Sequence, residues 1–536
     1  MHLGWLLRGI HHFSAQAFVV MLVVHLLQMI VYRGYQSPRE IDFWLLLALV
    51  PLTITISATG WLLPYDQKGF WASRVPMSIV ASVPLLGPMI QKLAIGGADF
   101  GHHTLTRFFA MHAGLLPPII GALLLAHFAL QRRHRLAARD VPGPVAAYWP
   151  QQFARDALVC SAVLGAIVCL VMLPRWVDPD ALPGVALGAP ADPSEQYSAA
   201  RPEWFMLFLF QFLKSPFLTG WFGHYGELVG AFIVPGAILG MFCLMPFIAR
   251  QWRHGHRFNV AFTACLGAGI VFLIAAAYRE DAANPAYAEA VRLARQQAER
   301  SRVLAESPAG IPNAGALAML RNDPLTQGPK LFAQHCASCH RYDGHDGLGR
   351  TPKDPQSAAD LKDFATRRWI GGVLDPERVA STNYFGGTAH KDGKMVKFVQ
   401  RDVPKYDETE QANLRKVILA LSAEAQLRSQ IDADQRDAAD IRAGRKLFAD
   451  LSCLDCHQFR NKDPDATAPD LTGYGSRDWL MGIIRNAAHP RFYGKKNDRM
   501  PKFGPDGILT EREIGLLTSW LRGEWYEPPT VAQTAR

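Results

Sequence analysis

No apolar run long enough to cross a membrane occurs after Tyr278 in this chain of 536 residues. That part of the sequence begins with a charged, alanine-rich stretch and continues as polar sequence rich in glycine, aspartate and lysine, so we expect it to be water-soluble. The N-terminal region also lacks the marks of a signal peptide, because its first apolar run is long and no small-residue cleavage site follows Tyr32. We interpret that run as a membrane helix.

Residues 1 to about 280 have the opposite character and contain six apolar runs. A helix needs about 20 apolar residues to cross a bilayer core roughly 30 Å thick, and the runs suit that length. The hydrophobic share of 49 % averages these runs with the polar second half, and the chain length indicates several domains. The predicted membrane helices are residues 13–32, 43–63, 108–130, 157–173, 228–248 and 260–278.

The net charge of +9 requires no nucleic-acid partner, because the arginines are placed as the positive-inside rule demands. They gather between the third and fourth runs and between the fifth and sixth, so we expect both connections to be cytoplasmic. The chain ends then fall on the opposite, positive side of the membrane. The arginines are Arg132, Arg133, Arg135, Arg139, Arg155, Arg250, Arg253 and Arg257.

Two of the apolar runs carry histidines at matching spacings: His11 and His25 are fourteen residues apart, and His112 and His127 are fifteen apart. At about 100° and 1.5 Å per residue, each pair returns to nearly the same helix face roughly 21 to 23 Å along the axis. The two runs cross the membrane in the same direction, so His11 can face His112 and His25 can face His127.

Facing histidines at two depths predict two bis-histidine b-type haems, because imidazole supplies an axial iron ligand without adding charge. The alternative is that each histidine only hydrogen-bonds a neighbouring helix. Polar groups are costly in lipid and usually functional there, which favours the haem interpretation for four histidines at paired spacings.

The first half of the sequence resembles the cytochrome b subunit of cytochrome bc and b6f complexes. The resemblance covers residues 4 to about 280 and rests on "GWLLRGIHHFSA", "YRGYQSPRE", "TGWLLPYDQKGFWA", "TLTRFFAMH" and "GAPADPSEQYSAARPEWF". It implies an all-α transmembrane helical bundle that fuses a b6-like part, residues 1–140, with a subunit IV-like part, residues 141–280. The family's first membrane helix is missing, so we expect a misplaced start codon or a separately encoded helix.

The resemblance also implies a quinol site on the positive side, where the family's PEWY motif provides a glutamate that accepts a proton from quinol. Glu203 suits that task, because a carboxylate at the edge of an apolar segment can exchange protons with a bound hydroquinone. The alternative is an ordinary carboxylate at a helix start. The motif residues are Pro202, Glu203, Trp204 and Phe205, the last in place of the family's tyrosine.

Two arginines match basic residues of the family. Arg132 corresponds to one near the negative-side quinone pocket and Arg8 to one near a haem propionate, and both also fit positive-inside anchors. The sequence departs from the family at Leu46, where a close-packing glycine is usual fourteen residues before the one that matches Gly60. We therefore expect different packing around the second b haem.

Four of the eight cysteines form two C-x-x-C-H motifs, "CASCH" and "CLDCH", in the second half. This is the attachment pattern of c-type haem, with the histidine as the proximal ligand. A zinc or thiol-redox site is the alternative for a single motif, whereas two motifs favour haem. The motif residues are Cys336, Cys339, His340, Cys453, Cys456 and His457.

Both motifs belong to an internal repeat that resembles tandem class I cytochrome c domains. "GPKLFAQHCASCH" parallels "GRKLFADLSCLDCH", and "DLKDFATRRWIGGVL" parallels "DLTGYGSRDWLMGII". Met395 and Met500 occupy the same place in the repeat and are the predicted distal ligands. Thioether ligation raises the reduction potential of a haem. His390 is the alternative to Met395 as distal ligand. The predicted parts are a helical linker at 281–325 and cytochrome c domains at 326–425 and 438–526.

These features predict the cytochrome b/c subunit of a quinol:cytochrome c oxidoreductase-like respiratory complex, with two noncovalent b-type and two covalent c-type haems. Haem attachment to C-x-x-C-H takes place on the outer side, so we expect a multi-pass protein of the bacterial inner membrane with periplasmic c domains. No C-x-H…C-x-x-H set occurs in the chain, so a Rieske iron–sulfur subunit has to be separate.

Further expected partners are the membrane quinone pool, a soluble or membrane-bound electron acceptor and a second copy of the complex. The alternative function is a non-bifurcating subunit that connects the quinone pool to a periplasmic reductase. A haem-poor scaffold is a third possibility, and it predicts that all four membrane histidines tolerate replacement.

Overall fold

The computed structural model describes residues 3–134, 148–178, 185–461, 463 and 465–529. Arg135 and Arg139 of the predicted cytoplasmic connection lie outside the described residues. The chain divides into two compact units, Met1–Glu299 and Arg300–Arg536, and each is described by itself. The finer domain boundaries that the sequence suggests stay predictions.

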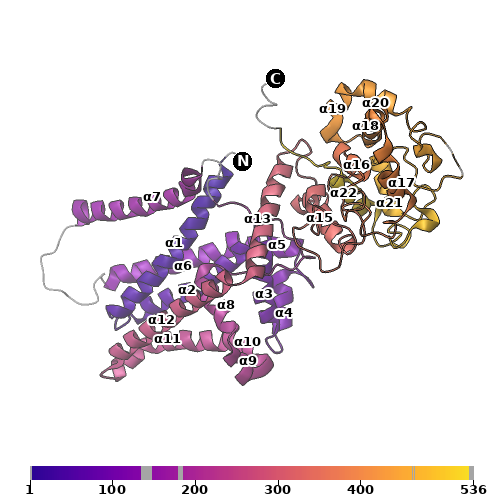
Figure 1. Ribbon diagram of the computed structural model, residues 1–536. Coiled ribbons are helices and arrows are strands. Elements are labelled where there is room, and N and C mark those ends of the chain that lie inside the picture. The colour runs from indigo at the N-terminus through magenta and orange to yellow at the C-terminus, as the bar shows by residue number, and fades with distance from the viewer. Residues whose placement is uncertain (1–2, 135–147, 179–184, 462, 464, 530–536) are drawn as a thin grey trace. The chain divides into compact units, whose positions relative to one another are not determined.

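The regular structure of the described residues consists of helices, with isolated bridges but no β-strand, which confirms the all-α prediction. Six helices of the first unit are long and apolar enough to cross a membrane, one for each predicted run (Figure 1). They are α1 (Gly4–Val31), α2 (Glu40–Trp61), α5, η1 and α6 (His102–Phe109, Ala110–Leu115, Leu116–His134), η2 and α7 (Tyr148–Gln152, Phe153–Val177), α9, η4, α10, η5 and α11 (Pro216–Phe222, Gly223–Tyr225, Gly226–Leu228, Val229–Ile233, Val234–Gln251), and α12 (Gly255–Ala282).

Shorter helices connect these spans. Asp66 begins α3 because its side chain accepts a hydrogen bond from the Gly69 amide at 2.8 Å, as N-cap residues do. Gly96 ends α4 in the left-handed conformation, with φ of 84°, where glycine carries no penalty. The connecting helices are α3 (Gln67–Ala81), α4 (Gly87–Ile95), η3 (Trp204–Met206) and α8 (Leu207–Leu213), and α13 (Pro285–Ala305) follows the last span.

The core of the first unit forms around α2, which packs against α1, α6 and α11. Phe43, Leu46 and Leu49 of α2 are at most 2 % exposed and contact Ile30 of α1 and Met245 of α11. The side chain of Leu46 therefore fills core space at the position where the resemblance leads one to expect glycine.

The outer faces of the spanning helices expose large apolar side chains. Leu125, Phe128, Val271 and Phe272 are between 63 % and 72 % exposed. Soluble monomers rarely expose contiguous apolar surface of this kind, whereas a helix in lipid satisfies its backbone internally and can leave such side chains uncovered. The first unit thus has the surface of a membrane protein.

The second unit contains the two sequence repeats. In each repeat a helix precedes the C-x-x-C-H motif, and a helix with a capping box closes the repeat, with Asp407 capping α18 and Thr510 capping α22. The helices are α14 (Ala316–Arg321), α15 (Pro324–His335), α16 (Arg367–Val373), α17 (Lys394–Arg401), η6 (Val403–Lys405), α18 (Glu408–Glu424), η7 (Arg428–Gln430), α19 (Ile431–Arg436), α20 (Ala438–Gly444), η8 (Cys453–Asp455), α21 (Arg477–Arg485), η9 (Gly494–Lys496) and α22 (Glu511–Leu521).

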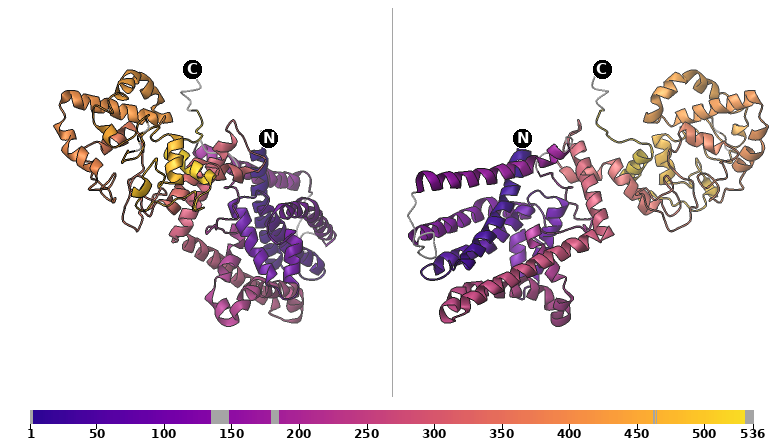
Figure 2. Two further views of the ribbon diagram at one scale, coloured as in Figure 1. Left: turned by 90° about the vertical axis from the view of Figure 1, so that its right-hand side faces the viewer. Right: turned by 60° about the vertical axis from the view of Figure 1, so that its left-hand side comes forward.

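Two helix pairs of this unit join one repeat to the other. α15, which precedes the first C-x-x-C-H motif, packs against α22 at the end of the second repeat (Figure 2, where α22 is yellow). α20, which precedes the second motif, packs against α18 of the first repeat. Each of these two pairs therefore contains one helix from each repeat.

Candidate functional site

The first histidine pair lies where α1 approaches the π-helical turn η1. The rings of His11 and His112 are 6.0 Å apart between centroids and nearly perpendicular. His112 Nδ1 donates to the Ile56 carbonyl oxygen at 2.9 Å, which leaves Nε2 for another ligand. Turns of the π type occur frequently at functional sites, and this one carries His112.

Gly60 of α2 makes room for the His112 ring. A Cβ atom at this position would lie 2.6 Å from His112 Cε1, which is closer than carbon atoms approach without displacement. Thr59, the neighbouring residue, places its hydroxyl 3.3 Å from His112 Nδ1. One turn of α2 therefore fixes both the position and the orientation of this imidazole.

The second pair, His25 and His127, meets further along the same two spans. Their Nε2 atoms face each other at 3.1 Å, and the ring planes are nearly perpendicular. Gln131 places its amide nitrogen 3.2 Å from His25 Nε2 and 3.0 Å from His127 Nε2. The structure thus brings together both histidine pairs that the spacing predicts.

A buried carboxylate holds the other side of the His127 ring. His127 Nδ1 lies 2.6 Å from Asp42 Oδ1 and 3.1 Å from the Asp42 carbonyl oxygen, and the Asp42 side chain is 2 % exposed. Metal-binding histidines commonly have their second nitrogen held by a carboxylate or carbonyl. The sequence alone does not single out Asp42, because an aspartate in the first turn of a helix is an ordinary feature.

These residues fit b-type haem at both levels. Each level offers one imidazole from α1 and one from the third span, and the Nε2 atoms of His25 and His127 face each other. A carbonyl or carboxylate at Nδ1 of His112 and His127 leaves Nε2 as the iron-binding nitrogen. The ligand roles of the four histidines stay a prediction.

Glu203 forms an ion pair with Lys68 of α3, with Oε1 and Nζ 3.0 Å apart. The glutamate side chain is 17 % exposed and the lysine side chain 51 % exposed. Lys68 stands in "DQKGFWA", where nothing in the sequence connects it with a carboxylate far along the chain. The contact places Glu203 beside α3, with its carboxylate mostly shielded from water.

The residues after Glu203 rest on α1 and on the end of α2. Trp204 donates its indole N–H to Gln16 Oε1 at 2.7 Å, and the ring of Phe205 lies 6.1 Å from that of Trp61. Pro202, half-buried, precedes these contacts. The four motif residues therefore lie near the part of α1 that carries His11.

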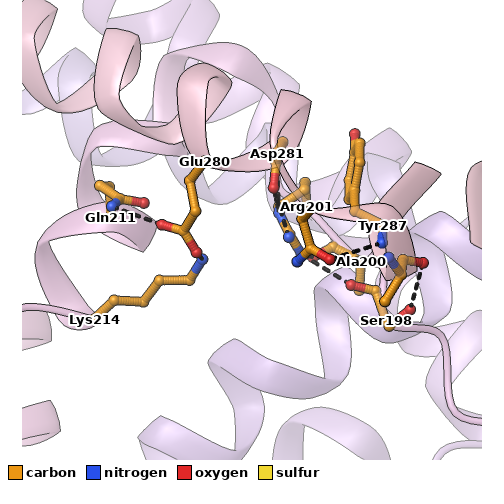
Figure 3. Close-up of polar contacts among 10 residues, drawn as sticks. Ser198, Ala200, Arg201, Gln211, Lys214, Glu280, Asp281 and Tyr287 are labelled. Atoms are coloured by element: carbon orange, nitrogen blue, oxygen red, sulfur yellow. Dashed lines mark hydrogen bonds and ion pairs between the residues drawn. The ribbon is translucent and has the colours of Figure 1, made fainter.

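An ion pair fastens this segment to the end of α12 (Figure 3). Arg201 Nη2 lies 2.7 Å from Asp281 Oδ1, and Arg201 Nε lies 3.1 Å from Asp281 Oδ2. The guanidinium also lies 4.9 Å from the ring centroids of both Phe210 and Tyr287. Since Arg201 is two residues before Glu203, this contact restrains the loop that carries the carboxylate.

The two arginines that match basic residues of the family lie in different surroundings. Arg8 Nη1 donates to the Val185 carbonyl oxygen at 2.6 Å. Arg132 is exposed, one residue after Gln131 in α6. Contact with a haem propionate by Arg8 and with quinone by Arg132 both stay predictions.

The two C-x-x-C-H histidines have matching environments. His340 Nδ1 donates to the Ala359 carbonyl oxygen at 2.8 Å, and His457 Nδ1 donates to the Pro469 carbonyl oxygen at 2.7 Å. Burial lowers the pKa of both histidines, against the opposing effect of these carbonyl bonds. Both rings are therefore neutral at pH 7, with Nε2 available to a metal.

Cys336 and Cys453 are poor nucleophiles in this environment. Burial raises the pKa of the Cys336 thiol to about 12 and that of the Cys453 thiol to about 11. A thiol-redox site needs a lowered thiol pKa and solvent access. Cys339 and Cys456 are partly buried in turn, so the motifs fit covalent haem attachment better than disulfide exchange.

The predicted distal ligands lie in different apolar clusters. Met500 packs in the cluster that contains Cys336, whereas Met395 packs beside Val396 in another. His390, the competitor of Met395, stacks on Tyr493 with ring centroids 5.7 Å apart. The first C-x-x-C-H motif therefore shares its core with the methionine of the other repeat.

Two parts of the chain match family models. Residues 16–184 match the model described as Cytochrome b(N-terminal)/b6/petB, and residues 441–525 match the model described as Cytochrome c. The chain thus contains a cytochrome b6-type N-terminal domain and a cytochrome c domain. Both kinds of domain bind haem and serve electron transport.

Several relatives of known identity are cytochrome b6 proteins. That of Picosynechococcus sp. (strain ATCC 27264 / PCC 7002 / PR-6) is 34 % identical over 137 residues, which cover 26 % of this chain and 62 % of the relative. That of Prochlorothrix hollandica is 35 % identical over 134 residues, 25 % of this chain and 60 % of the relative. The chain thus spans less than two thirds of these relatives.

A solved structure described as "Hyperthermophilic respiratory Complex III" aligns with 52 % of this chain and 80 % of its own. The identity is 20 % and the TM-score is 0.38.

Proposed function

We propose that this chain, which combines a cytochrome b6-type domain with a cytochrome c domain, is the cytochrome b/c subunit of a quinol:cytochrome c oxidoreductase-like complex. The observation that carries the proposal is the meeting of histidines from two membrane helices at two levels, most directly the 3.1 Å approach of His25 Nε2 and His127 Nε2. The two matching C-x-x-C-H environments support two further haems. The subunit then holds two noncovalent b-type and two covalent c-type haems.

Each bound haem supplies a reversible one-electron centre. The membrane helices hold the imidazoles in fixed orientations, His112 through the Ile56 carbonyl and His127 through Asp42. The two levels are roughly 21 to 23 Å apart along α1 by helix geometry. This arrangement provides an electron route between the two sides of the membrane.

Glu203 is the proton acceptor at the proposed quinol site. Its carboxylate is mostly shielded from water and positioned by Lys68, and it takes a proton from a quinol hydroxyl bound beside it. Trp204 and Phe205 supply the apolar walls that a quinol ring requires, and Arg201 keeps the loop in place. Release of this proton on the positive side, with quinone reduction near Arg132 on the other, translocates protons.

The proposed complex includes a separate Rieske iron–sulfur subunit, which accepts one electron of each quinol and passes it to the c haems. A soluble or membrane-bound acceptor takes electrons from the c haems, and the complex is a homodimer in the bacterial inner membrane. The C-terminal haem domains face the periplasm. Absence of any C-x-H…C-x-x-H set in the chain supports the separate Rieske subunit.

Haem analysis of the membrane-extracted chain tests this proposal. We expect two extractable b haems and two covalent c haems per chain. His127→Leu should remove one b haem and leave the c haems in place, while His134→Leu, a change at the end of the same helix, should remove none. A full b-haem content in His127→Leu would contradict the membrane haem site.

Quinol oxidation separates the proposed function from its alternative. With a Rieske subunit present, a bifurcating complex reduces both the b and the c haems, and without it neither step proceeds at the full rate. Equal quinol oxidation with and without the Rieske subunit would instead support a non-bifurcating subunit that connects the quinone pool to a periplasmic reductase.

A further inference from the structure

The tandem repeat suggests that each c haem is enclosed by its own repeat, but the first C-x-x-C-H motif lies in a core built from both. Phe332 of α15 lies 5.5 Å from Trp520 of α22 between ring centroids, and Tyr342 stacks on the same indole at 4.2 Å. Gly328 allows this crossing, because a Cβ atom there would collide with Trp520. α15 therefore packs against α22, the closing helix of the second repeat.

The second motif has the reciprocal partner. Gly444 of α20 lies against the Lys416 carbonyl and Ala420 of α18, where a Cβ atom would again collide. Phe448, the counterpart of Phe332 in the repeat, shares an apolar cluster with Val417 of α18. α20, the helix before the second motif, therefore packs against α18, the closing helix of the first repeat.

The two repeats cross each other at equivalent positions, so that the first half of each repeat packs with the second half of the other. Ala365 and Gly475 occupy the same place in "DLKDFATRRW" and "DLTGYGSRDW", and they contact each other. Their neighbours Phe364 and Tyr474 also meet, with ring centroids 5.4 Å apart. Arg522 donates to the Gly475 carbonyl and fixes the crossing.

Two lobes result, and each contains one C-x-x-C-H motif with the closing half of the other repeat. The first lobe comprises α15, "CASCH", α21 and α22, and its apolar cluster contains Cys336, Met481 and Met500. The second comprises α20, "CLDCH", α16 and α18. Leu374 packs both in the cluster around Cys453 and in the cluster of Met395, which connects that methionine to the second lobe.

We propose that the distal ligands of the c haems cross between the repeats: Met500 ligates the iron whose proximal ligand is His340, and Met395 ligates the iron held by His457. The inference rests on the c-type haem attachment of the proposed function. It follows from the shared core of Cys336 and Met500 and from the exchange at Ala365 and Gly475. On this assignment, residues 326–425 and 438–526 are sequence repeats rather than separate folded lobes.

Peroxide treatment of the full-length, four-haem chain tests the assignment. Haem with an open sixth position is the first to be bleached, and proteolysis then separates the "CASCH" and "CLDCH" haem peptides for quantification. Met500→Leu conserves volume, and we expect loss of haem from the "CASCH" peptide. Met395→Leu should cause loss from the "CLDCH" peptide. Met481→Leu is the matched control in the same cluster and should cause neither loss.

Bleaching of the "CLDCH" peptide, of both peptides or of neither in Met500→Leu overturns the assignment. Met500→His provides a second check, because a new sixth ligand should restore protection of the "CASCH" haem and lower the reduction potential of that haem only. Failure of the proposed function has a different signature, since the unaltered chain would then yield no haem peptide at all.

Discussion

At the scale of single residues, four of the six histidines proposed to ligate haem have an oxygen atom close to Nδ1. Backbone carbonyls serve His112, His340 and His457, whereas His127 also has the carboxylate of Asp42. A carboxylate makes the imidazole a stronger electron donor than a carbonyl does. The His25/His127 site is therefore set apart chemically from the other three.

Replacement of Asp42 tests that difference. Asp42→Asn keeps the shape of the side chain and removes its charge, so we expect haem affinity at the His25/His127 site to fall about 10- to 100-fold. Retention of extractable haem during detergent dialysis measures the change. Glu40→Gln, in the same first turn of α2, should retain haem like the unaltered chain. Equal retention in both variants would remove Asp42 from the site.

Gly60 offers a steric test of the other membrane site. Gly60→Ala places a methyl group 2.6 Å from His112 Cε1, so we expect loss of the b haem held by His11 and His112. Gly121→Ala is the control, because that glycine of α6 has open space around it and alanine favours a helix by about 1 kcal/mol. Difference spectra at each step of a redox titration distinguish the two b haems. A full titration amplitude in Gly60→Ala would mean that the ring can move aside.

At the scale of elements, length and hydropathy were sufficient to predict the six membrane helices, because a lipid-facing helix must be apolar over its whole length. The histidine pairs followed from helix periodicity alone. The π-helical turn around His112 and the contact of Lys68 with Glu203 could not be predicted, since both depend on how distant segments pack. Gln131, between His25 and His127, carries no sequence signal either.

Two neighbouring ion pairs join the region around Glu203 to α12. Because one pair is buried and the other exposed, we expect their loss to have unequal effects on stability and quinol oxidation. Arg201 and Asp281 are 13 % and 11 % exposed, so Arg201→Met leaves a buried charge unpaired, at a cost of about 3 to 5 kcal/mol. We expect slower quinol oxidation with haem content retained. Lys214→Met breaks the exposed pair with Glu280 and should cost about 1 kcal/mol or less. Quinol oxidation rates normalised to b-haem content measure the effect of each variant. Equal rates in Arg201→Met and Lys214→Met would argue against a restraining role for Arg201.

At the scale of the whole molecule, the sequence repeat predicted two c-type haem motifs and their counterpart methionines but not the partners of the helices. Repeat similarity is the same whether α15 packs on α18 or on α22, so the pattern contains no information on that choice. Contacts such as those of Trp520, Gly328 and Gly444 reveal it. The expected boundaries at 326–425 and 438–526 follow the repeat and stay predictions.

Exchange of helices predicts that neither repeat is stable alone. A fragment of residues 300–425 lacks α20 and α22 and would expose the apolar faces of both α15 and α18. We expect this fragment to be proteolysed or aggregated, whereas residues 300–536 should unfold in one cooperative transition of denaturant, followed at both haems. A compact, haem-loaded fragment 300–425 would show that the repeats close on themselves.

The crossing at Ala365 and Gly475 also determines the order in which the parts of the second unit can fold during biosynthesis. The chain is synthesised from the N-terminus, yet Phe332 beside the first C-x-x-C-H motif can pack against Trp520 only after α22 has been made. Until then one side of the "CASCH" segment, the proposed site of haem attachment, is uncovered. On the proposed function, this motif can receive its haem first but is enclosed last, so the folding of α22 completes the maturation of the c-haem unit.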